Sequence, residues 1–336
     1  MRPIPSLLFS LAAPVLFAQV SPFNDLPFEP RESGVHRIII SGHLHGASND
    51  RSGFPAGTVL ANIDRINALD ADLFLSTGDL FLDAGADHDR YAWSFFSKLE
   101  VPLFNAPGNH DKGAFYDRNF GPSHRMIALG DDRIVLLDTE VADGTLGSDQ
   151  LAMLEQLLDP APPRIFIISH RPLWAENDDR YGPLFEGNTR SFIGNNYKKD
   201  VEPLLQRLAE RSEIFWASGS MAGNAPSSIF FQPHAPNITF IQSAIRNEKR
   251  DAILIADVSP TAIKWSAISL TGQQLEAPEK YDAEFWGVKR AKKEPFNWRL
   301  LPYLIKITVS DRAFWYGFGV AVLLLIGLRA ALRRWL

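Results

Sequence analysis

The chain has 336 residues, of which 46% are hydrophobic and 22% are charged, so it is long and apolar enough to fold around a sizeable core. Its formal net charge of −5 gives the protein as a whole no reason to bind nucleic acid, and we expect no nucleic-acid partner. The absence of cysteine excludes disulfides, thiolate zinc sites and cysteine nucleophiles.

Residues 1–18 are predicted to form a secretory signal peptide. A basic start at Arg2 is followed by an apolar stretch from Leu7 to Phe17 and then by the small residue Ala18. Such a segment directs the rest of the chain across the cytoplasmic membrane. The alternative is an uncleaved anchor at the same position.

Residues 34–268 alternate strand-like and helix-like runs and are predicted to form one domain. Helix-like segments, with apolar residues three or four positions apart, cover residues 57–69, 91–99, 148–158 and 201–209. Strand-like runs are HRIIISG, DLFLST, VPLFNAP, RIVLLDT, RIFIISH, EIFWASG, SIFFQ, ITFIQSA, AILIADV and AIKWSAI. Alternation of strands with helices, followed by strands alone, predicts a layered α/β fold with a largely two-sheet core.

Residues 269–312 are predicted to link this domain to a membrane. The segment is first basic and then aromatic and leucine-rich, so its lysines would lie near lipid phosphates at the membrane surface. A solvated linker without a membrane role is the alternative.

Residues 313–332 are predicted to form a transmembrane helix. Ala313 to Leu328 contain no charge, and Trp315 and Tyr316 are placed where an aromatic belt would lie. The arginines near the C-terminus predict that this end lies in the cytoplasm and that the main domain lies outside it, in the periplasm. A buried core helix is the alternative.

Polar side chains gather where the predicted strands end. Ligands of open α/β sheets bind outside the carboxyl ends of the strands, so these groups are candidate site residues. A lone Gly-Asp is usually a turn, and a lone histidine at a strand end is usually structural. The tetrapeptide Gly-Asn-His-Asp is far more specific. The four groups are Ser41–Gly46, Ser76–Asp79, Gly108–Asp111 and Ser169–Pro172.

In this order and spacing the chain resembles the calcineurin-like metallophosphoesterases over about residues 36–268. The family pattern is Asp-x-His, Gly-Asp, Gly-Asn-His-Asp or -Glu, a later His, and Gly-His-x-His. Gly78-Asp79 matches the second motif, Gly108–Asp111 the third and His170 the fourth. The resemblance implies a calcineurin-like four-layer α/β/β/α sandwich that binds one or two divalent metal ions, often manganese, iron or zinc, at the strand ends.

The resemblance also implies a role for each matched residue. Asp79 would bridge two metals, and Asn109 and His170 would hold the second metal. His110 would act on the phosphate or the leaving oxygen, with Asp111 orienting it. Two cations a few Å apart can clamp a phosphoryl group and lower the pKa of a bound water molecule.

Two motifs depart from the family pattern. His43-Leu44-His45 stands where Asp-x-His is expected, which removes one negative charge but keeps an imidazole that can bind a metal. Ser220 and Ala222 stand at the two histidines of the fifth motif. Asp83 and His234 are candidates to substitute for them. The remaining predicted ligands are His43, His45, Asp79, Asn109 and His170.

Two functional hypotheses follow from these residues. The first is a membrane-anchored, extracytoplasmic metal-dependent phosphoesterase, which hydrolyses a phosphorylated substrate with metal-activated water. An envelope lipid or glycan phosphate is a candidate substrate because of the membrane position. The second is a catalytically inactive binding protein that keeps the fold. The retained pair His110-Asp111 favours the enzyme, whereas the missing fifth motif favours the binding protein.

Overall fold

The computed structural model describes residues 19–31, 34–47, 52–142, 144–175, 178–185, 195–219, 228–288, 301–310 and 312–335. The predicted signal peptide lies outside the described residues. So do Ser220 and Ala222, which stand at the two histidine positions of the fifth motif.

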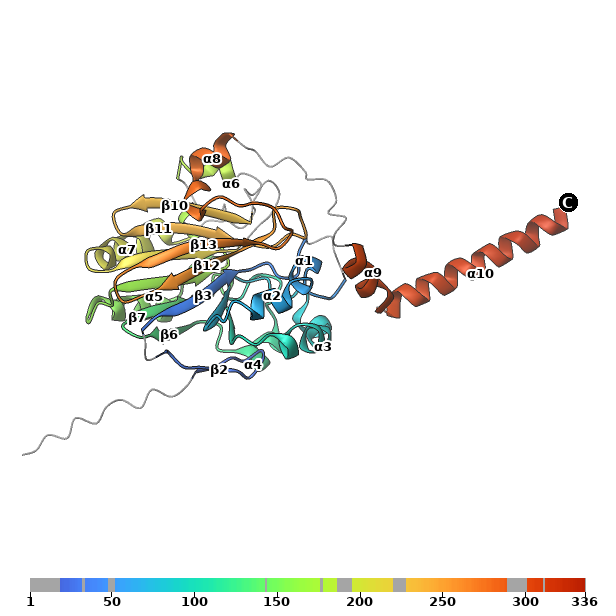
Figure 1. Ribbon diagram of the computed structural model, residues 1–336, viewed down its shortest axis with the longest axis horizontal. Coiled ribbons are helices and arrows are strands. Elements are labelled where there is room, and N and C mark those ends of the chain that lie inside the picture. The colour runs from blue at the N-terminus through green and yellow to red at the C-terminus, as the bar shows by residue number, and fades with distance from the viewer. Residues whose placement is uncertain are drawn as a thin grey trace, which may run out of the picture.

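Two mixed β-sheets form the centre of the domain (Figure 1). The five-stranded sheet has the order β13-β12-β3-β4-β5, and the six-stranded sheet has the order β10-β11-β9-β8-β7-β6. The strands of the first sheet are β3 (His36–Ser41), β4 (Leu73–Ser76), β5 (Leu103–Asn105), β12 (Ala252–Val258) and β13 (Ile263–Ser269). Those of the second are β6 (Arg125–Leu129), β7 (Asp132–Leu136), β8 (Arg164–Ser169), β9 (Glu213–Ser218), β10 (Ile229–Ala235) and β11 (Ile238–Ser243). A small third sheet pairs β1 (Gln19–Val20) with β2 (Pro27–Phe28).

Helices cover the outer face of each sheet, which gives the four layers expected from the sequence (Figure 1). The five-stranded sheet is covered by α1 (Gly57–Leu60), α2 (Ile63–Asn67), α3 (Ala84–Ser94) and α4 (Ala114–Phe120). The six-stranded sheet is covered mainly by α5 (Ser148–Glu155) and α7 (Glu202–Ala209). Short helical turns cover Phe96–Lys98, Gln156–Leu158, Leu173–Ala175, Tyr197–Val201 and Pro278–Lys280, and α6 is Gly182–Phe185.

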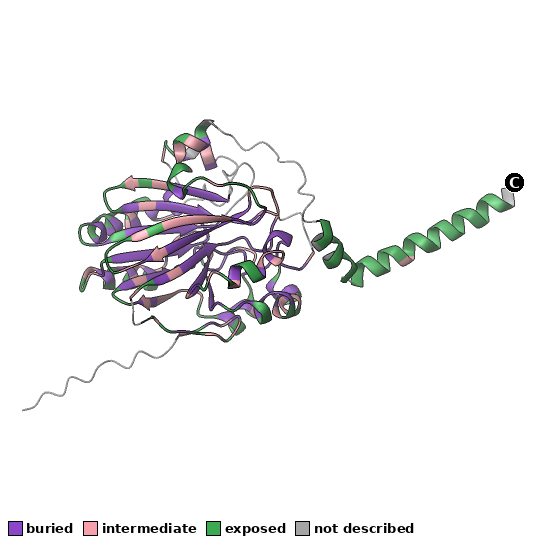
Figure 2. Cartoon of the chain, viewed as in Figure 1, coloured by how far each residue is buried: buried purple, intermediate pink, exposed green. Residues whose placement is uncertain are grey.

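Alternating apolar residues along the strands build the layers. On β8, Phe166 and Ile168 enter the core between the two sheets, whereas Ile165 and Ile167 pack against the helices. Both faces of this strand are buried, which agrees with its continuous run of apolar residues. Figure 2 shows that the strands of the two sheets are largely buried. The predicted fold class is therefore confirmed.

The predicted helix over residues 57–69 is two helices. The side-chain amide of Asn62 donates hydrogen bonds to the carbonyls of Thr58 and Leu270, each at 2.8 Å. The side-chain amide of Asn62 thus bonds to the Thr58 carbonyl in place of a helical backbone N–H, and α1 ends at Leu60. The predicted helix at 91–99 is the end of α3 followed by a 3₁₀ turn.

The segment after β13 differs in part from the predicted linker over residues 269–312. Residues 278–288 pack on the six-stranded sheet, and the indole of Trp286, in α8 (Ala283–Val288), donates to the carbonyl of Ile229 at 3.2 Å. The aromatic residues of this segment therefore extend the core of the domain.

Two further helices follow. α9 (Leu301–Ser310) contacts α1, and α10 (Arg312–Trp335) projects away from the domain (Figure 1). Residues Arg312–Arg333 form a helix long and apolar enough to cross a membrane, with a mean hydropathy of 1.8. None of that span is buried in the domain, which differs from the environment of a core helix.

Candidate metal centre

Four loops that follow strands meet at one edge of the two sheets. His43 and His45 follow β3, Asp79 follows β4, His110 follows β5 and His170 follows β8. Strands β3, β4 and β5 are parallel neighbours, so their carboxyl ends lie together. Residues far apart in the sequence therefore come into contact here.

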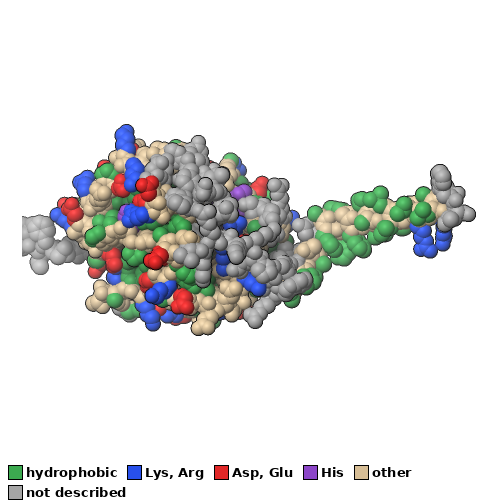
Figure 3. Space-filling model, turned by 90° about the horizontal axis from the view of Figure 1, so that it is seen from above, with side chains coloured by type: hydrophobic (Ala, Val, Ile, Leu, Met, Phe, Trp, Pro, Cys, Tyr) green, Lys and Arg blue, Asp and Glu red, His purple; other side chains and the backbone are tan. Residues whose placement is uncertain are grey.

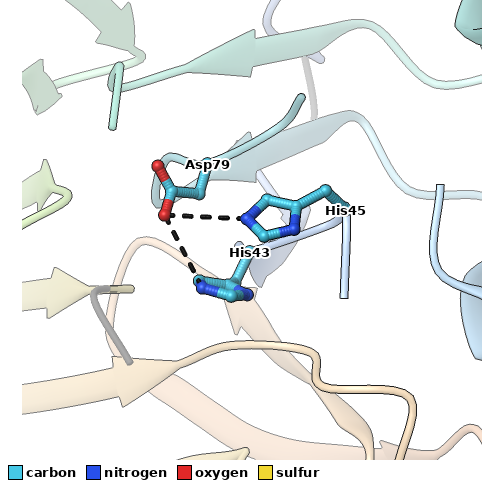
Figure 4. A group of neighbouring side chains, drawn as sticks. All are labelled: His43, His45 and Asp79. Carbon is cyan, nitrogen blue, oxygen red and sulfur yellow. Dashed lines mark ion pairs between the residues drawn. The ribbon is translucent and has the colours of Figure 1, made fainter. Parts of the chain in front are cut away.

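Three imidazoles surround one carboxylate oxygen. The Nε2 atoms of His43 and His45 lie 3.6 and 3.8 Å from Asp79 Oδ2 (Figure 4). The Nε2 atom of His170 lies 3.3 Å from the same oxygen. All four side chains are buried. Ligand atoms of His43, His45 and Asp79 lie within 4.8 Å of one another, so these three residues could hold a metal ion together.

The hydrogen bond of His170 indicates that a cation would lie between its Nε2 atom and Asp79 Oδ2. Its Nδ1 lies 3.1 Å from the carbonyl oxygen of Thr77, which can only accept, so Nδ1 carries the hydrogen. In a neutral ring the lone pair of Nε2 then faces the negative oxygen of Asp79, an arrangement that a cation would stabilise.

The spacing of the atoms also fits a cation. Two ligand atoms that each lie ~2.1 Å from one tetrahedral ion are about 3.4 Å apart. The three nitrogen–oxygen distances of 3.3, 3.6 and 3.8 Å are close to this value. Among the described residues, His45 Nε2 and His170 Nε2 are buried without a hydrogen-bond partner. The residues present therefore fit a divalent metal.

Two of these residues adopt backbone conformations that are unusual for residues other than glycine. His43 has a φ of 55° and Asp79 a φ of 52°. Left-handed backbone of this kind costs on the order of 1–3 kcal/mol per residue and is concentrated at functional sites. The backbone N–H of His43 donates to the carbonyl of Gly78 at 2.7 Å and ties the two loops together.

The glycine of the third motif is required by close packing. A Cβ atom on Gly108 would collide with Asp79 Oδ1, so only glycine allows this loop to lie against the carboxylate. The next loop residues then fasten that carboxylate, because the backbone N–H of His110 donates to Asp79 Oδ1 at 3.0 Å. The Oδ2 atom is left to face the histidines.

Burial and neighbouring charges set the protonation of the site. Burial alone would raise the pKa of Asp79, but the three surrounding imidazoles outweigh burial and hold its pKa well below the usual range. Burial, followed by the neighbouring His45, lowers the pKa of His43 to about 3. Asp79 is therefore a carboxylate and His43 a neutral imidazole near neutral pH, which is the state that binds a metal.

His110 lies beside this cluster and is partly exposed. Its ring centroid is 5.0 Å from that of His45. Its Nδ1 lies 3.1 Å from the carbonyl oxygen of Leu82, so Nδ1 donates and Nε2 is left for another partner.

The carboxylate of Asp111 is bonded to the loop backbone and makes no direct bond to the imidazole of His110 among the described contacts. Its carboxylate accepts hydrogen bonds from the backbone N–H groups of Phe81 and Gly108, at 3.0 and 2.8 Å, and from the side-chain amide of Asn105 at 3.0 Å. The imidazole of His110 bonds to Leu82 instead. Asp111 thus fastens the loop that carries His110, and its role in orienting that imidazole stays a prediction.

Three further candidate ligands, Asn109, Asp83 and His234, have different surroundings. Asn109 sits between Gly108 and His110 and is partly exposed, so it stays a predicted ligand. Asp83 accepts a hydrogen bond from the N–H of Ala86 and caps α3. His234 bonds to the hydroxyl of Tyr181 at 2.8 Å, on β10. Neither Asp83 nor His234 therefore substitutes for a missing ligand in this conformation.

A loop that the sequence did not single out also borders the site. The backbone N–H of Ile245 donates to the carbonyl of Gly42 at 2.9 Å, and a Cβ on Gly46 would lie 2.9 Å from the amide nitrogen of Asn247. Arg246 lies between them, and its charge contributes to the lowered pKa of His43. No sequence motif marks this loop, because its proximity depends on the pairing of β11 with β9.

The strand before the fifth motif also reaches the site. The N–H of Gly219 donates to the carbonyl of His170 at 3.1 Å, and a Cβ on Gly219 would collide with Thr77. Gly219, the first residue of the fifth motif, therefore lies beside the loops that carry the second and fourth motifs.

The sequence of this chain matches a known protein family. The family description "calcineurin-like phosphoesterase" matches residues 35–240. A probable cyclic nucleotide phosphodiesterase from Fibrobacter succinogenes is 31% identical over 111 residues, which cover 31% of this chain. The match spans 43% of that protein, less than half of its length.

Two solved structures are similar at low sequence identity. A purple acid phosphatase from yellow lupin (Lupinus luteus) seeds aligns with 74% of this chain and 54% of its own, at 15% identity and a TM-score of 0.49. A dimetal phosphatase from Danio rerio aligns with 70% of this chain and 96% of its own, at 12% identity and a TM-score of 0.48. The family match covers well over half of the chain, so this protein belongs to the calcineurin-like phosphoesterase family of metal-dependent hydrolases.

Proposed function

We propose that this protein is a membrane-anchored, extracytoplasmic phosphoesterase with an altered metal site. The observation that carries the proposal is the convergence of His43, His45 and His170 on one oxygen of Asp79. Such a cluster is costly to bury without a cation, and the family to which the chain belongs hydrolyses phosphate esters.

The proposed ligands fall into two groups. His43, His45 and Asp79 would hold the first ion, and Asp79, Asn109 and His170 a second. Manganese, iron and zinc are the proposed metals, because imidazole nitrogen and carboxylate oxygen suit all three. When bound, the metal supplies Lewis acidity toward a phosphoryl oxygen and lowers the pKa of a coordinated water molecule.

The chain's own residues would position the substrate and move a proton. Asp79 Oδ1 is held by the N–H of His110, which keeps the carboxylate at a constant angle to the histidines. His110 has its Nδ1 committed to Leu82, so its Nε2 would protonate the leaving oxygen or neutralise charge on the phosphate. Asp111 would position His110 through the loop backbone.

The membrane position is part of the proposal. The span Arg312–Arg333 would cross the cytoplasmic membrane once, with its arginine-rich end in the cytoplasm and the main domain outside. Figure 3 shows hydrophobic side chains along this helix and basic side chains near its free end. An envelope lipid or glycan phosphate is then within reach. A cyclic phosphodiester joins these proposed substrates because of the name of the Fibrobacter succinogenes relative.

The test is hydrolysis by full-length protein that has been stripped of metal and then resupplied with manganese, zinc, iron, nickel or magnesium. Generic phosphomonoesters and phosphodiesters serve as substrates. The proposal predicts hydrolysis that is absent after chelation, returns with at least one ion and follows the amount of ion bound. Bound metal without hydrolysis of either ester class would instead support the binding protein, which the altered fifth motif favours.

A further inference from the structure

The metal centre and the C-terminal helices lie at the same end of the domain. The loop that carries His43 and His45 is bonded to α1, because the N–H of Ala56 donates to the carbonyl of Leu44 at 2.7 Å. Thr58 of α1 is in turn bonded to the buried Asp251 at 2.8 Å. α1 therefore borders the site and is bonded both to its loop and to the domain core.

The helix α9 contacts α1. It lies beside α1 at the end of the domain from which α10 projects (Figure 1). One residue, Asp311, separates α9 from α10. The metal centre is thus joined through α1 and α9 to the helix that is long and apolar enough to cross a membrane.

One face of α9 carries exposed apolar side chains. Leu301, Ile305 and Val309 are 38%, 52% and 41% exposed. Residues four apart share one face of a helix, so the three form a stripe. The helix α10 begins at Arg312, two positions after the end of α9, and it also exposes apolar side chains. Figure 2 shows both helices as exposed, and a lipid bilayer around α10 is therefore the medium that would cover the stripe.

Basic residues also lie near α1. Asn247 accepts a hydrogen bond from the N–H of Thr58 in α1 at 3.2 Å, and the surrounding segment 246–250 contains three cations and one anion. Lys306 of α9 is also exposed. Cations at this position would face the anionic headgroups of a bilayer whose acyl chains cover the stripe.

We propose that α9 lies in the membrane interface with Leu301, Ile305 and Val309 in contact with lipid, which seats the metal centre at headgroup level and makes a lipid phosphate ester the substrate. This inference rests on the proposed phosphoesterase activity and narrows its substrate class to esters carried by membrane lipids. Hydrolysis breaks the phosphorus–oxygen bond of the ester, with water supplying the new oxygen on phosphorus and a proton going to the leaving oxygen.

The first test measures the position of α9 without using activity. The chain has no cysteine, so a single introduced thiol is the only labelling site. Full-length Ile305→Cys and Lys306→Cys would carry an environment-sensitive fluorophore in vesicles of phosphatidylcholine and phosphatidylglycerol. Lys306 is the matched control, because the next residue of a helix is turned by about 100°. We expect quenching by acyl-chain nitroxide lipids at Ile305 and much less at Lys306. Equal exposure of both labels to water would overturn the interfacial position.

The second test measures two esters of 4-methylumbelliferyl phosphate with the metal-loaded full chain in the same vesicles. One carries a hexadecyl chain and enters the bilayer, and the other carries a methyl group and stays in water. The double variant Leu301→Gln/Ile305→Gln should lower hydrolysis of the embedded ester about tenfold, because misplaced reacting groups lose rate steeply, and leave the soluble ester nearly unchanged. Ser310→Gln, on the opposite side of α9, should change neither rate.

The outcomes separate this inference from the activity on which it rests. Equal rates on both esters, or equal loss on both in the double variant, would overturn the lipid-substrate inference and leave the phosphoesterase assignment standing. No metal-dependent hydrolysis of either ester would overturn the phosphoesterase assignment and the lipid substrate together, while the fluorophore measurement would still decide where α9 lies.

Discussion

The carboxylate of Asp79 lies at the centre of the candidate site. One of its oxygens accepts the N–H of His110, and the other faces three imidazoles. Its left-handed backbone and the lack of any side chain on Gly108 are both needed for this placement. The site therefore depends on local backbone geometry as well as on ligand identity.

The substitution Asp79→Asn should lower metal affinity by at least about tenfold, because the neutral amide lacks the negative charge of the carboxylate that faces the histidines. Metal content per chain after dialysis against a fixed free-ion concentration measures this. Asp83→Asn is the matched control, since Asp83 only caps α3 and asparagine caps equally well. Equal metal content in Asp79→Asn and wild type would show that this carboxylate is not a ligand.

The substitution Gly108→Ala should also remove metal, because the added methyl group collides with Asp79 Oδ1 and displaces the carboxylate. We expect metal content to fall while the far-ultraviolet circular dichroism stays that of the folded chain. Gly85→Ala is the control, because its added Cβ meets atoms no closer than 3.6 Å. A fully metal-loaded Gly108→Ala protein would show that the contact between residue 108 and Asp79 is not needed for metal binding.

Much of the site could be predicted from residue types alone. The histidines and Asp79 come directly after apolar strands, where parallel pairing brings side chains together. The contacts of Asp111 could not be predicted, because its partners Phe81, Gly108 and Asn105 are brought together by loop packing. The loop around Arg246 was missed for the same reason.

At the scale of elements, apolar runs in the sequence predict most of the strands. A single polar side chain, Asn62, marks the break in the predicted helix over residues 57–69. The ten strand-like runs correspond to β3, β4, β5 and β7–β13. The strand β6 was missed, although Gly130 and Asp131 form the turn that joins it to β7, and Gly-Asp between two apolar runs is a hairpin signal. At the break between α1 and α2, the side chain of Asn62 bonds to Thr58 and also to the distant Leu270, a contact that local periodicity cannot reveal.

The link between α1 and the strand β12 has a consequence for pH. Asp251, fully buried just before β12, accepts hydrogen bonds from Thr58, from Ser228 and from the N–H of Arg246. Burial raises its pKa from the ordinary 3.8 to about 6, and the nearby Glu248 adds to the rise. Between these pH values the folded state keeps a proton that the unfolded state releases.

Stability should therefore fall as the pH rises from 3.8 to about 6, and this group should account for about 3 kcal/mol of that fall. Asp251→Asn has no proton to lose, so the slope of unfolding free energy against pH in this window should flatten. Urea unfolding of the full chain in detergent micelles at several pH values measures it. Asp159→Asn, at an exposed turn, should keep the wild-type slope. An unchanged slope in Asp251→Asn would refute the assignment.

At the scale of the whole molecule, the sequence composition predicts the long apolar helix at the C-terminal end, but it does not predict the packing of the segment before that helix. The exposed helix α10 matches the predicted span over residues 313–332 within a few residues. Tyr281 and Trp286 fall within the predicted linker over residues 269–312, yet they pack on the domain. Aromatic residues near a membrane helix suit either environment, so composition alone could not distinguish them.

The proposed topology predicts the behaviour of two reporter fusions. An enzyme that is active only in the periplasm, joined after Ser310, should be active, because this point precedes the span and lies on the proposed outer side. The same reporter joined after Trp335 should be inactive although the fusion protein is present in equal amount on an immunoblot, because this point lies on the proposed cytoplasmic side. Activity of a cytoplasm-only reporter after Ser310 would reverse the topology.

The central claim is that this family member is a working metal-dependent phosphoesterase despite its altered motifs. The most direct measurement is the rate of phosphodiester hydrolysis by metal-loaded wild type and His110→Ala, with His88→Ala as a control for removal of a partly exposed histidine outside the site. We predict that His110→Ala lowers the rate by 10²–10⁴, the usual range for a lost general acid or base, with nearly unchanged metal content. His88→Ala should match wild type. Identical rates for wild type and His110→Ala across manganese, zinc, iron, nickel and magnesium would contradict the claim and leave only the fold.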